Sequence, residues 1–185
     1  MPIPRNWVEE LAVEWLAING YLTETNVRLK APERGGVAEA DVVGAKISNE
    51  QLHIIHIETG SLAGGFEKDL TTVRKKFEKA KRDAIEGMIE DLVEWEADKD
   101  YEAVYIASYA ANVDRLKAEL KQDKIEFLML QEFIRTKVFE AIDRWKRRQL
   151  EAGRRKTVTI TLPECHWLLN LLDFLRRRSL LSLKG

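Results

Sequence analysis

Two adjacent apolar segments, rich in β-branched residues, constrain the fold of this chain more than any other feature. The first runs from Val37 to Gly44 and the second from Leu52 to Thr59, and residues 47–51 between them have the composition of a tight hairpin turn. Apolar residues occupy both faces of the second segment. This pattern predicts a central strand in a sheet that is covered on both sides.

Polar side chains interrupt this pair of apolar segments at a few positions. Because side chains alternate between the two faces of a strand, His56 and Glu58 share one face, whereas His53 points to the other. Asp41 lies on the preceding strand. Aliphatic residues normally occupy such central positions, so these polar groups indicate a candidate functional site.

Helix and strand patterns continue on either side of the hairpin. We expect a helix from Trp7 to Asn19 with Asn6 as its N-cap, and a long helical stretch from Phe66 to Ala97 that Gly87 breaks or bends. The other expected elements are strands at Tyr21–Leu29, Tyr101–Ser108, Ile125–Leu130 and Thr157–Leu162, and helices at Asn112–Gln122, Gln131–Glu151 and from Pro163 onward. Strand, helix and strand at this spacing form a crossover unit, so the predicted class is α/β with a mixed central sheet flanked by helices.

Composition favours one domain in a reducing compartment. The chain has 185 residues, of which 45% are hydrophobic, and this is enough for a substantial core. We predict an α/β domain over residues 1–151 and a C-terminal strand and helix extension over residues 152–185, packed on the same domain. The single cysteine, Cys165, excludes an internal disulfide, and the sequence shows no signal peptide or apolar run of membrane-spanning length. We therefore expect a cytoplasmic protein with no membrane partner.

The order of these residues resembles the PD-(D/E)XK nuclease superfamily, whose members have a restriction-endonuclease-like fold. Glu9 lies in the first helix, Gly20-Tyr21 begins the first strand, and Asp41 stands at the position of the superfamily's aspartate. The segment His56-Ile57-Glu58 takes the place of the Glu-x-Lys motif. The resemblance covers residues 7 to about 60. It implies metal-assisted hydrolysis of phosphodiester bonds, in which carboxylates hold Mg²⁺ or Mn²⁺.

The resemblance also implies a role for each residue of the site. Asp41, His56 and Glu58 would surround the metal ion, with Glu58 in place of the lysine that orients the attacking water, and Glu9 would complete the catalytic set. An imidazole suits Mn²⁺ better than Mg²⁺, and a glutamate in the place of the lysine can act as ligand or base. The missing lysine, however, removes a cation from the scissile phosphate. Two hypotheses follow: a metal-dependent DNA endonuclease, or a catalytically inactive nuclease-fold module that binds DNA or another partner.

Basic residues gather in two stretches that could contact DNA phosphates. The candidate contacts are Arg74, Lys75, Lys79, Arg147, Arg148, Arg154 and Arg155. In the stretch from Phe66 to Ala97 the basic half precedes the acidic half, which is the reverse of the order that the helix dipole favours. Contact with a phosphate backbone would explain this order, and so would pairing with an antiparallel neighbour or a second subunit.

The last helix supplies a third hypothesis. The segment from Trp167 to Leu175 is unusually apolar, so it belongs to the core or to the interface of a homodimer, and the protein could be an interaction module. His166 beside Cys165 lacks further zinc ligands, so we expect no zinc site there. The sequence has no P-loop, dinucleotide-binding fingerprint, Gly-x-Ser-x-Gly elbow or Cys-x-x-Cys pair, which excludes the commonest enzyme classes.

Overall fold

One mixed sheet organises the part of the chain that the computed structural model describes, residues 6–29, 38–94, 98–152 and 160–181. Its strands follow the order of the sequence: β1 (Leu22–Leu29), β2 (Ala38–Ser48), β3 (Gln51–Leu62), β4 (Lys99–Ala110) and β5 (Ile125–Met129). The pairs β1–β2 and β2–β3 are antiparallel, whereas β3–β4 and β4–β5 are parallel. The predicted mixed central sheet, with the second strand of the hairpin in its middle, is confirmed.

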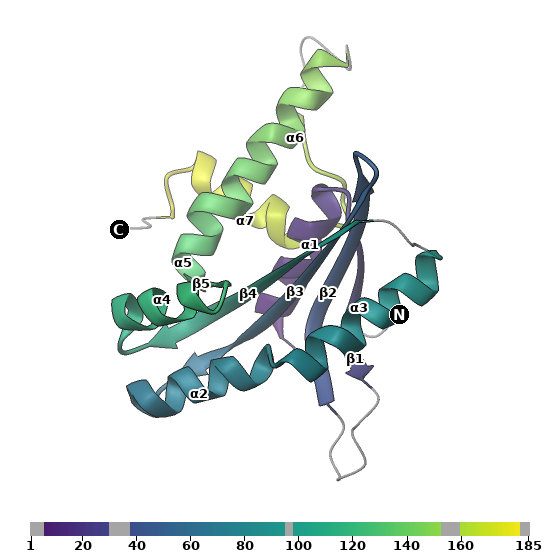
Figure 1. Ribbon diagram of the computed structural model, residues 1–185. Helices are drawn as coiled ribbons and strands as arrows, with labels where there is room; N and C mark the ends of the chain where they lie inside the picture. Colours follow the sequence, from purple (N-terminus) through teal and green to yellow (C-terminus); the bar gives the residue numbers. More distant parts are fainter. Residues whose placement is uncertain (1–5, 30–37, 95–97, 153–159, 182–185) are drawn as a thin grey trace.

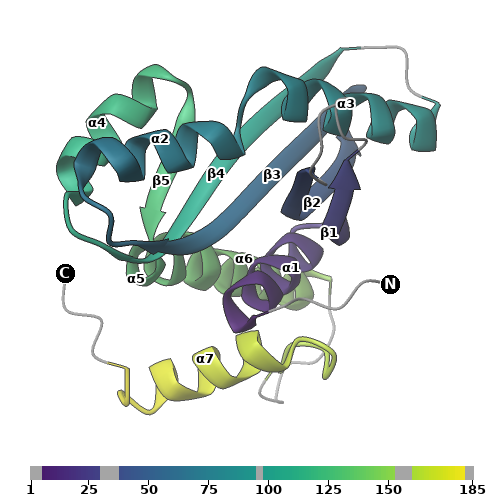
Figure 2. The same cartoon turned by 90° about the horizontal axis from the view of Figure 1, so that it is seen from below.

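Helices cover both faces of this sheet (Figures 1 and 2). One face carries α2 (Phe66–Lys76), α3 (Lys79–Val93) and α4 (Val113–Gln122). The other face carries α1 (Trp7–Ile18) and a continuous helical segment made of α5 (Leu130–Glu132), η1 (Phe133–Val138) and α6 (Phe139–Glu151). The last helix, α7 (Trp167–Arg177), packs against α1 and α6 on their outer side. The predicted flanking helices are thus confirmed.

The hairpin between β2 and β3 has the tightest kind of turn. Asn49 and Glu50 have φ angles of 52° and 59°, and the flanking residues Ser48 and Gln51 are paired. A two-residue turn with positive φ at both positions twists in the same sense as the strands, which fixes their register. In that register Val42 pairs with Ile57 and Val43 pairs with His56.

The long helix that we expected from Phe66 to Ala97 is wrong, because the chain breaks it near its middle. Phe77 ends α2, and Glu78 is extended, with a ψ angle of 151°, before α3 begins. Gly87, where we expected the break, lies inside α3. Neither glycine nor proline is present at the actual break. The Phe77 ring instead packs on the His56 ring, with 4.8 Å between centroids, so tertiary contacts reorient the chain here.

The C-terminal part also differs from expectation. Residues 160–162, the described part of the predicted strand, are not a strand, and residues 157–159 lie outside the described ranges. The last helix begins at Trp167 rather than at Pro163. The buried carboxylate of Glu14 on α1 accepts the N–H groups of Leu168 and Leu169, at 3.1 and 2.9 Å, and so caps α7. Within the described ranges, no helix has both the length and the apolar content for crossing a membrane.

Candidate functional site

Two carboxylates from neighbouring strands face each other on the side of the sheet that α2 and α3 cover. The pairing of Val42 with Ile57 places Asp41 of β2 next to Glu58 of β3. Alternation along each strand turns both side chains to the same face. The Glu58 side chain is fully buried and that of Asp41 is 17% exposed. Two of the four predicted site residues therefore lie side by side.

The break between α2 and α3 brings two lysines to this carboxylate pair. The Lys76 Nζ atom lies 2.5 Å from Glu58 Oε2 and 3.9 Å from Asp41 Oδ1, so one ammonium group faces both carboxylates. The Lys81 Nζ atom lies 3.6 Å from Glu58 Oε1 and donates to the Glu39 carbonyl oxygen at 3.0 Å. Lysines at the site were not expected, because a straight helix would not direct both toward one carboxylate.

His56 is buried beside Glu58, and both of its ring nitrogens have partners. Nε2 lies 3.0 Å from Glu58 Oε1, and Nδ1 lies 2.8 Å from the Tyr101 hydroxyl oxygen. An ionised carboxylate only accepts hydrogen bonds, so Nε2 donates to Glu58. In the neutral ring Nδ1 then accepts the Tyr101 hydroxyl proton. In this arrangement the imidazole has no nitrogen left for a metal ion.

The surroundings move the pKa values of the two carboxylates in opposite directions. Burial would raise the pKa of Glu58, but the hydrogen bond from His56 and the nearby Lys76 ammonium outweigh it, and the pKa is lowered. Burial and the negative charge of Glu58 raise the pKa of Asp41, although Thr59 N–H donates to Asp41 Oδ2 at 2.8 Å. The two carboxylates raise the pKa of Lys76 despite its burial. Two neighbouring carboxylates whose pKa values are moved in opposite directions are common in active sites, but ion-pair networks also produce such shifts.

A cavity of about 430 Å³ opens next to this cluster, at the end of the sheet where α1 begins. Asp41 and Lys76 face it, whereas Glu58 and His56 are not among the residues that line it. The other lining residues are Asn6, Trp7, Val8, Glu9, Thr59, Gly60, Ser61 and Ser108. Glu9 thus shares a cavity with Asp41, and its carboxylate also accepts from the side chain of its own N-cap, Asn6, at 2.5 Å. Among the described residues, no group of three His, Cys, Asp or Glu side chains is arranged to hold a metal ion.

The predicted DNA contacts do not all converge on this cavity. Lys75 and Lys79 are exposed on either side of the break between α2 and α3. Arg74 instead pairs with Asp123 of the neighbouring α4, at 2.8 Å. Arg148 donates to the Ile18 carbonyl oxygen at 3.3 Å, and its segment of α6 lies far from the α2–α3 break in Figure 1, as does the adjacent Arg147. Arg154 and Arg155 lie outside the described residues.

The break and ion pairs together explain the charge order that seemed reversed, since α2 by itself has acidic residues in its first turn and basic residues in its last turn. In the basic half, Lys76 and Lys81 neutralise Glu58. In the acidic half, Glu86 and Glu90 both pair with Lys99 of β4. These pairs join the two helices to β3 and β4 of the same chain, rather than to the antiparallel neighbour or second subunit that the sequence suggested.

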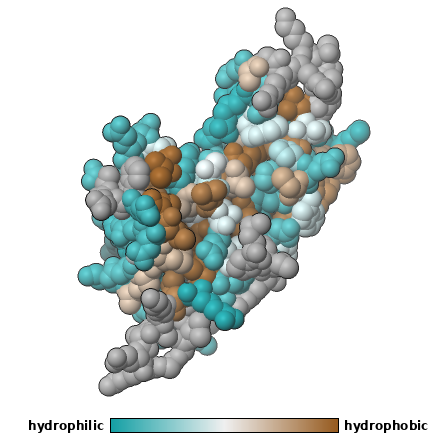
Figure 3. Space-filling model, turned by 90° about the vertical axis from the view of Figure 1, so that its right-hand side faces the viewer, coloured by the Kyte–Doolittle hydropathy of each residue, from teal (hydrophilic) through white to brown (hydrophobic). Residues whose placement is uncertain are grey.

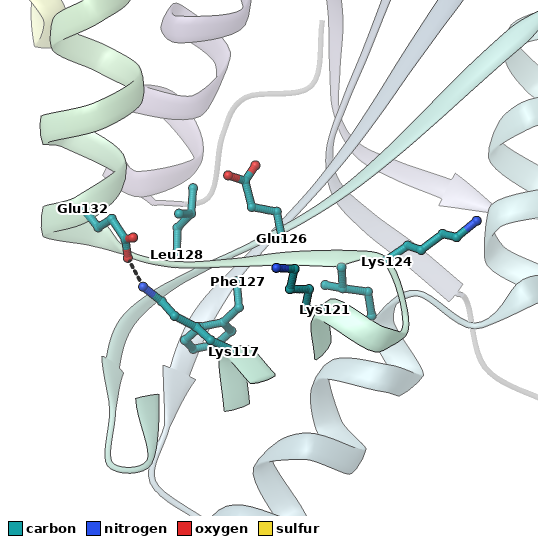
Figure 4. A pocket seen from close by; sticks show the side chains of 8 residues that line it. Lys117, Lys121, Lys124, Glu126, Phe127, Leu128 and Glu132 are labelled. Atoms are coloured by element: carbon teal, nitrogen blue, oxygen red, sulfur yellow. Dashed lines mark hydrogen bonds and ion pairs between the residues drawn. The ribbon is translucent and has the colours of Figure 1, made fainter. Parts of the chain in front are cut away.

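Two further cavities have linings that suit a functional site less well. One of about 430 Å³ lies beside β5 and α4, where Lys117 is directed at Glu132 and the side chains of Lys121 and Lys124 point in different directions (Figure 4). The other, of about 460 Å³, lies between α3 and β1 and includes Leu29, Met88 and Leu92. Figure 3 faces the side of the molecule on which α3 and β1 lie, and shows apolar side chains between polar ones there.

No protein-family model matches the chain, and no curated protein sequence matches it. Among solved structures, the chain is similar to one described as restriction endonuclease FokI bound to DNA, with a TM-score of 0.45 and 12% sequence identity. This likeness covers 90% of the chain and 27% of the FokI chain, so the protein spans about a quarter of that nuclease's length. The proposed function therefore rests on the geometry of Asp41, Glu58 and Lys76 rather than on this likeness.

Proposed function

We propose that the protein is a metal-dependent nuclease that hydrolyses phosphodiester bonds in DNA. The observation that carries this proposal is the Lys76 ammonium group, which lies between Asp41 and Glu58 on the wall of the cavity. Two carboxylates beside a lysine are the groups that the superfamily resemblance implies. Lys76 supplies from a helix the cation that seemed to be missing from the strand motif.

This geometry favours a different alignment of the superfamily motif, shifted by two residues along β3. Carboxylates that share a cation must face each other, and Asp41 faces Glu58, whereas His56 is paired with Val43. The segment Glu58-Thr59-Gly60 is then the counterpart of Glu-x-Lys, with Gly60 in place of the lysine. A Cβ atom at Gly60 would lie 2.6 Å from the Tyr105 hydroxyl oxygen, so a lysine does not fit there. In this proposal His56 holds and orients Glu58 instead of binding the metal.

The donor set fits Mg²⁺ or Mn²⁺. Magnesium sites commonly use one or two protein carboxylates, while substrate phosphates and water complete the shell. Asp41 and Glu58 would hold the ion, and Lys76, whose side chain is 34% exposed, would move toward the cavity and the phosphate. When bound, such an ion polarises the phosphate and acidifies a water molecule. Glu9 would supply a further carboxylate at the cavity wall, and the exposed Lys75 and Lys79 would contact flanking phosphates.

A second candidate function is DNA binding without cleavage. The observation that favours it is the charge balance around Glu58, since two lysines and the Nε2–H group of His56 already satisfy its carboxylate. A divalent ion would have to displace part of this network. An inactive module of this kind would still bind DNA, with an affinity that falls steeply as salt is added.

Cleavage assays with matched variants test both functions. The purified chain is incubated with DNA in Mg²⁺, Mn²⁺ or EDTA, alongside Asp41→Asn, Glu58→Gln and, as a control, Glu24→Gln, which changes an exposed carboxylate on β1. We expect cleavage with a divalent ion, and a loss in both site variants greater than the roughly 100-fold that removal of a supporting contact costs. Equal cleavage by Asp41→Asn and Glu24→Gln would refute the nuclease. Salt-dependent binding without cleavage in any metal would establish the second function.

A further inference from the structure

An exposed tryptophan stands at the mouth of the candidate active-site cavity. Trp7 is 51% exposed and lines the same cavity as Asp41 and Lys76. Within the described residues it belongs to none of the three apolar clusters that form the core. An indole ring left half in water beside charged groups is not explained by packing. An isolated exposed apolar side chain is common, so its position relative to the cavity is what matters.

The position of Trp7 is set by a rigid element. Asn6 caps α1 by accepting hydrogen bonds from the N–H groups of Val8 and Glu9, at 2.9 and 3.0 Å. Leu11, one turn further on, is fully buried against the sheet. Trp7 is therefore held at the first position of a helix whose rotation is fixed by its buried side. A side chain on a fixed backbone loses less conformational entropy when a flat ligand stacks on it than one on a flexible loop.

The other walls of the cavity offer groups that suit a phosphate. The Lys76 ammonium group faces the cavity, and the hydroxyl groups of Ser61 and Ser108 lie 2.6 Å apart in the same lining. Both serines are exposed, and a ligand at their hydroxyl groups would replace the bond between them and the one that Ser108 donates to the Gly60 carbonyl oxygen at 3.2 Å. An aromatic ring, a cation and hydroxyl groups in one lining match the two parts of a nucleotide, and the carboxylates of Glu9 and Asp41 lie in the same lining. The volume of about 430 Å³ lies in the range of small-ligand sites.

We infer that this cavity accepts a nucleotide whose base is unpaired and stacks on Trp7, while its phosphate lies toward Lys76. The preferred substrate is thus single-stranded DNA rather than an intact duplex. In a duplex both faces of each base are already stacked on neighbouring bases, so the indole cannot reach one without unstacking it. This inference rests on the proposed function for the identity of the site, and it adds the class of substrate.

Binding in the absence of metal tests the inference separately from catalysis. The probes are oligothymidylate of about 16 nucleotides, a length within single-strand site sizes, and its duplex with the complementary strand, both in EDTA. The variants are Trp7→Leu, which removes the aromatic face, and Trp7→Phe, which keeps one. The matched control is Phe174→Leu, which removes an aromatic ring exposed to 47% on α7, outside the lining of the cavity.

The wild type should bind the single strand more tightly than the duplex. Trp7→Leu should weaken single-strand binding by about 5-fold to 150-fold, the range that loss of one stacked base produces, with little effect on duplex binding. Trp7→Phe should retain most of the affinity, and Phe174→Leu should match the wild type. Circular dichroism confirms that each variant is folded.

Three results would overturn the inference: unchanged single-strand binding by Trp7→Leu, an equal loss in the control, or tighter binding of the duplex by the wild type. A fourth such result would be the absence of binding to both probes. Because EDTA prevents cleavage, a protein that fails to cut DNA but shows the expected binding pattern contradicts only the proposed hydrolysis. A protein that cuts DNA in Mn²⁺ and whose Trp7→Leu variant binds normally contradicts only the stacking.

Discussion

Lys76 Nζ lies 2.5 Å from Oε2 of Glu58, a carboxylate with no exposed surface, and this ion pair joins the end of α2 to the central strand of the sheet. The same ammonium group lies 3.9 Å from Asp41 Oδ1. The Lys76 ammonium group therefore occupies the position where a metal ion bound by both carboxylates would lie. Lys76 thus combines a structural contact with the proposed catalytic role, and stability measurements test the structural contact.

Lys76→Met should destabilise the fold. Removing one partner of a buried ion pair leaves the other charge poorly compensated, at a cost of roughly 3 kcal/mol, near the lower end of the usual range because Lys81 still faces Glu58. Urea denaturation at neutral pH measures the free energy of unfolding. Lys75→Met, the exposed neighbour, serves as the control and should change it by less than about 0.5 kcal/mol. Equal effects of the two substitutions would show that the ion pair contributes nothing.

Divalent ions should stabilise Lys76→Met more than the wild type. Without the ammonium group, Asp41 and Glu58 have a cation position open between them, and an ion that binds only the folded state raises the midpoint of thermal unfolding. Thermal scans with increasing Mn²⁺ or Mg²⁺ measure the shift for both proteins. A larger shift in the wild type, or none in either, would argue against a shared metal site at these two carboxylates.

Asp41→Asn should be more stable than the wild type at neutral pH, while losing activity. The folded pKa of Asp41 is raised by burial and by Glu58, so the folded state holds this proton more tightly than the unfolded chain does. Stability from this group is therefore lost as pH rises from the ordinary carboxyl value of 3.8 through the raised value. The variant's advantage should be present at pH 7 and should disappear below 3.8. Unfolding temperatures across this range measure it, and a variant less stable at pH 7 would contradict the expectation.

Glu58 and Lys76 should give pH dependences of stability that are opposite to each other in the wild type. The folded pKa of Glu58 is lowered, so its contribution is present above the ordinary value of 4.5 and is lost as pH falls through the lowered value. The folded pKa of Lys76 is raised, so its contribution is present below 10.5 and is lost as pH rises through the raised value. Glu58→Gln should abolish the loss of stability at low pH, and Lys76→Met should abolish the loss of stability at high pH.

His56→Phe should destabilise the fold by about 1–3 kcal/mol, because it removes one donor from Glu58, which keeps Lys76, and leaves the Tyr101 hydroxyl without its hydrogen-bond partner. Tyr101→Phe alone should cost about 1 kcal/mol. The double variant should cost less than the sum of the two, since the unpaired hydroxyl group is then absent. Strict additivity in urea denaturation would show that the two side chains are not coupled. Isothermal titration with Mn²⁺ supplies a second test, in which a loss of affinity of about 10-fold to 100-fold supports a positioning role for His56 and unchanged affinity contradicts it.

Glu14→Leu should loosen α7 from the rest of the protein. The Glu14 carboxylate accepts two N–H groups at the start of that helix, and burial raises its pKa although these bonds lower it. Leaving two buried N–H groups without an acceptor should cost roughly 2 kcal/mol or more. Limited trypsin digestion should then cut earlier at the arginines that end α7, Arg176 to Arg178. Glu14→Gln, which keeps an acceptor oxygen, is the control and should resist digestion better.

Side-chain alternation within two short segments predicted the strand pair that carries the candidate site. The sequence predicted that His56 and Glu58 share a face and that Asp41 lies on the preceding strand, and the register of the turn at Asn49 and Glu50 then places Asp41 beside Glu58. The helix from Trp7 and its Asn6 cap were also predictable, because an apolar stripe and a capping residue are local signals. These features depend on residues close together in the chain.

The identity of the groups around those carboxylates depended on tertiary structure. The chain breaks at Phe77 and Glu78 without glycine or proline, because the Phe77 ring packs on His56, and no local pattern predicts such a contact. That break directs Lys76 and Lys81 at Glu58. In the proposed nuclease, Lys76 from a helix then takes the place of the lysine that the strand motif lacks. Likewise, Trp7 reaches the cavity because α1 packs on one face of the sheet and begins beside the cavity. Sequence alone determined which face carries the acidic groups, because strand alternation is local. Packing between distant segments decided which cations and which aromatic ring face them.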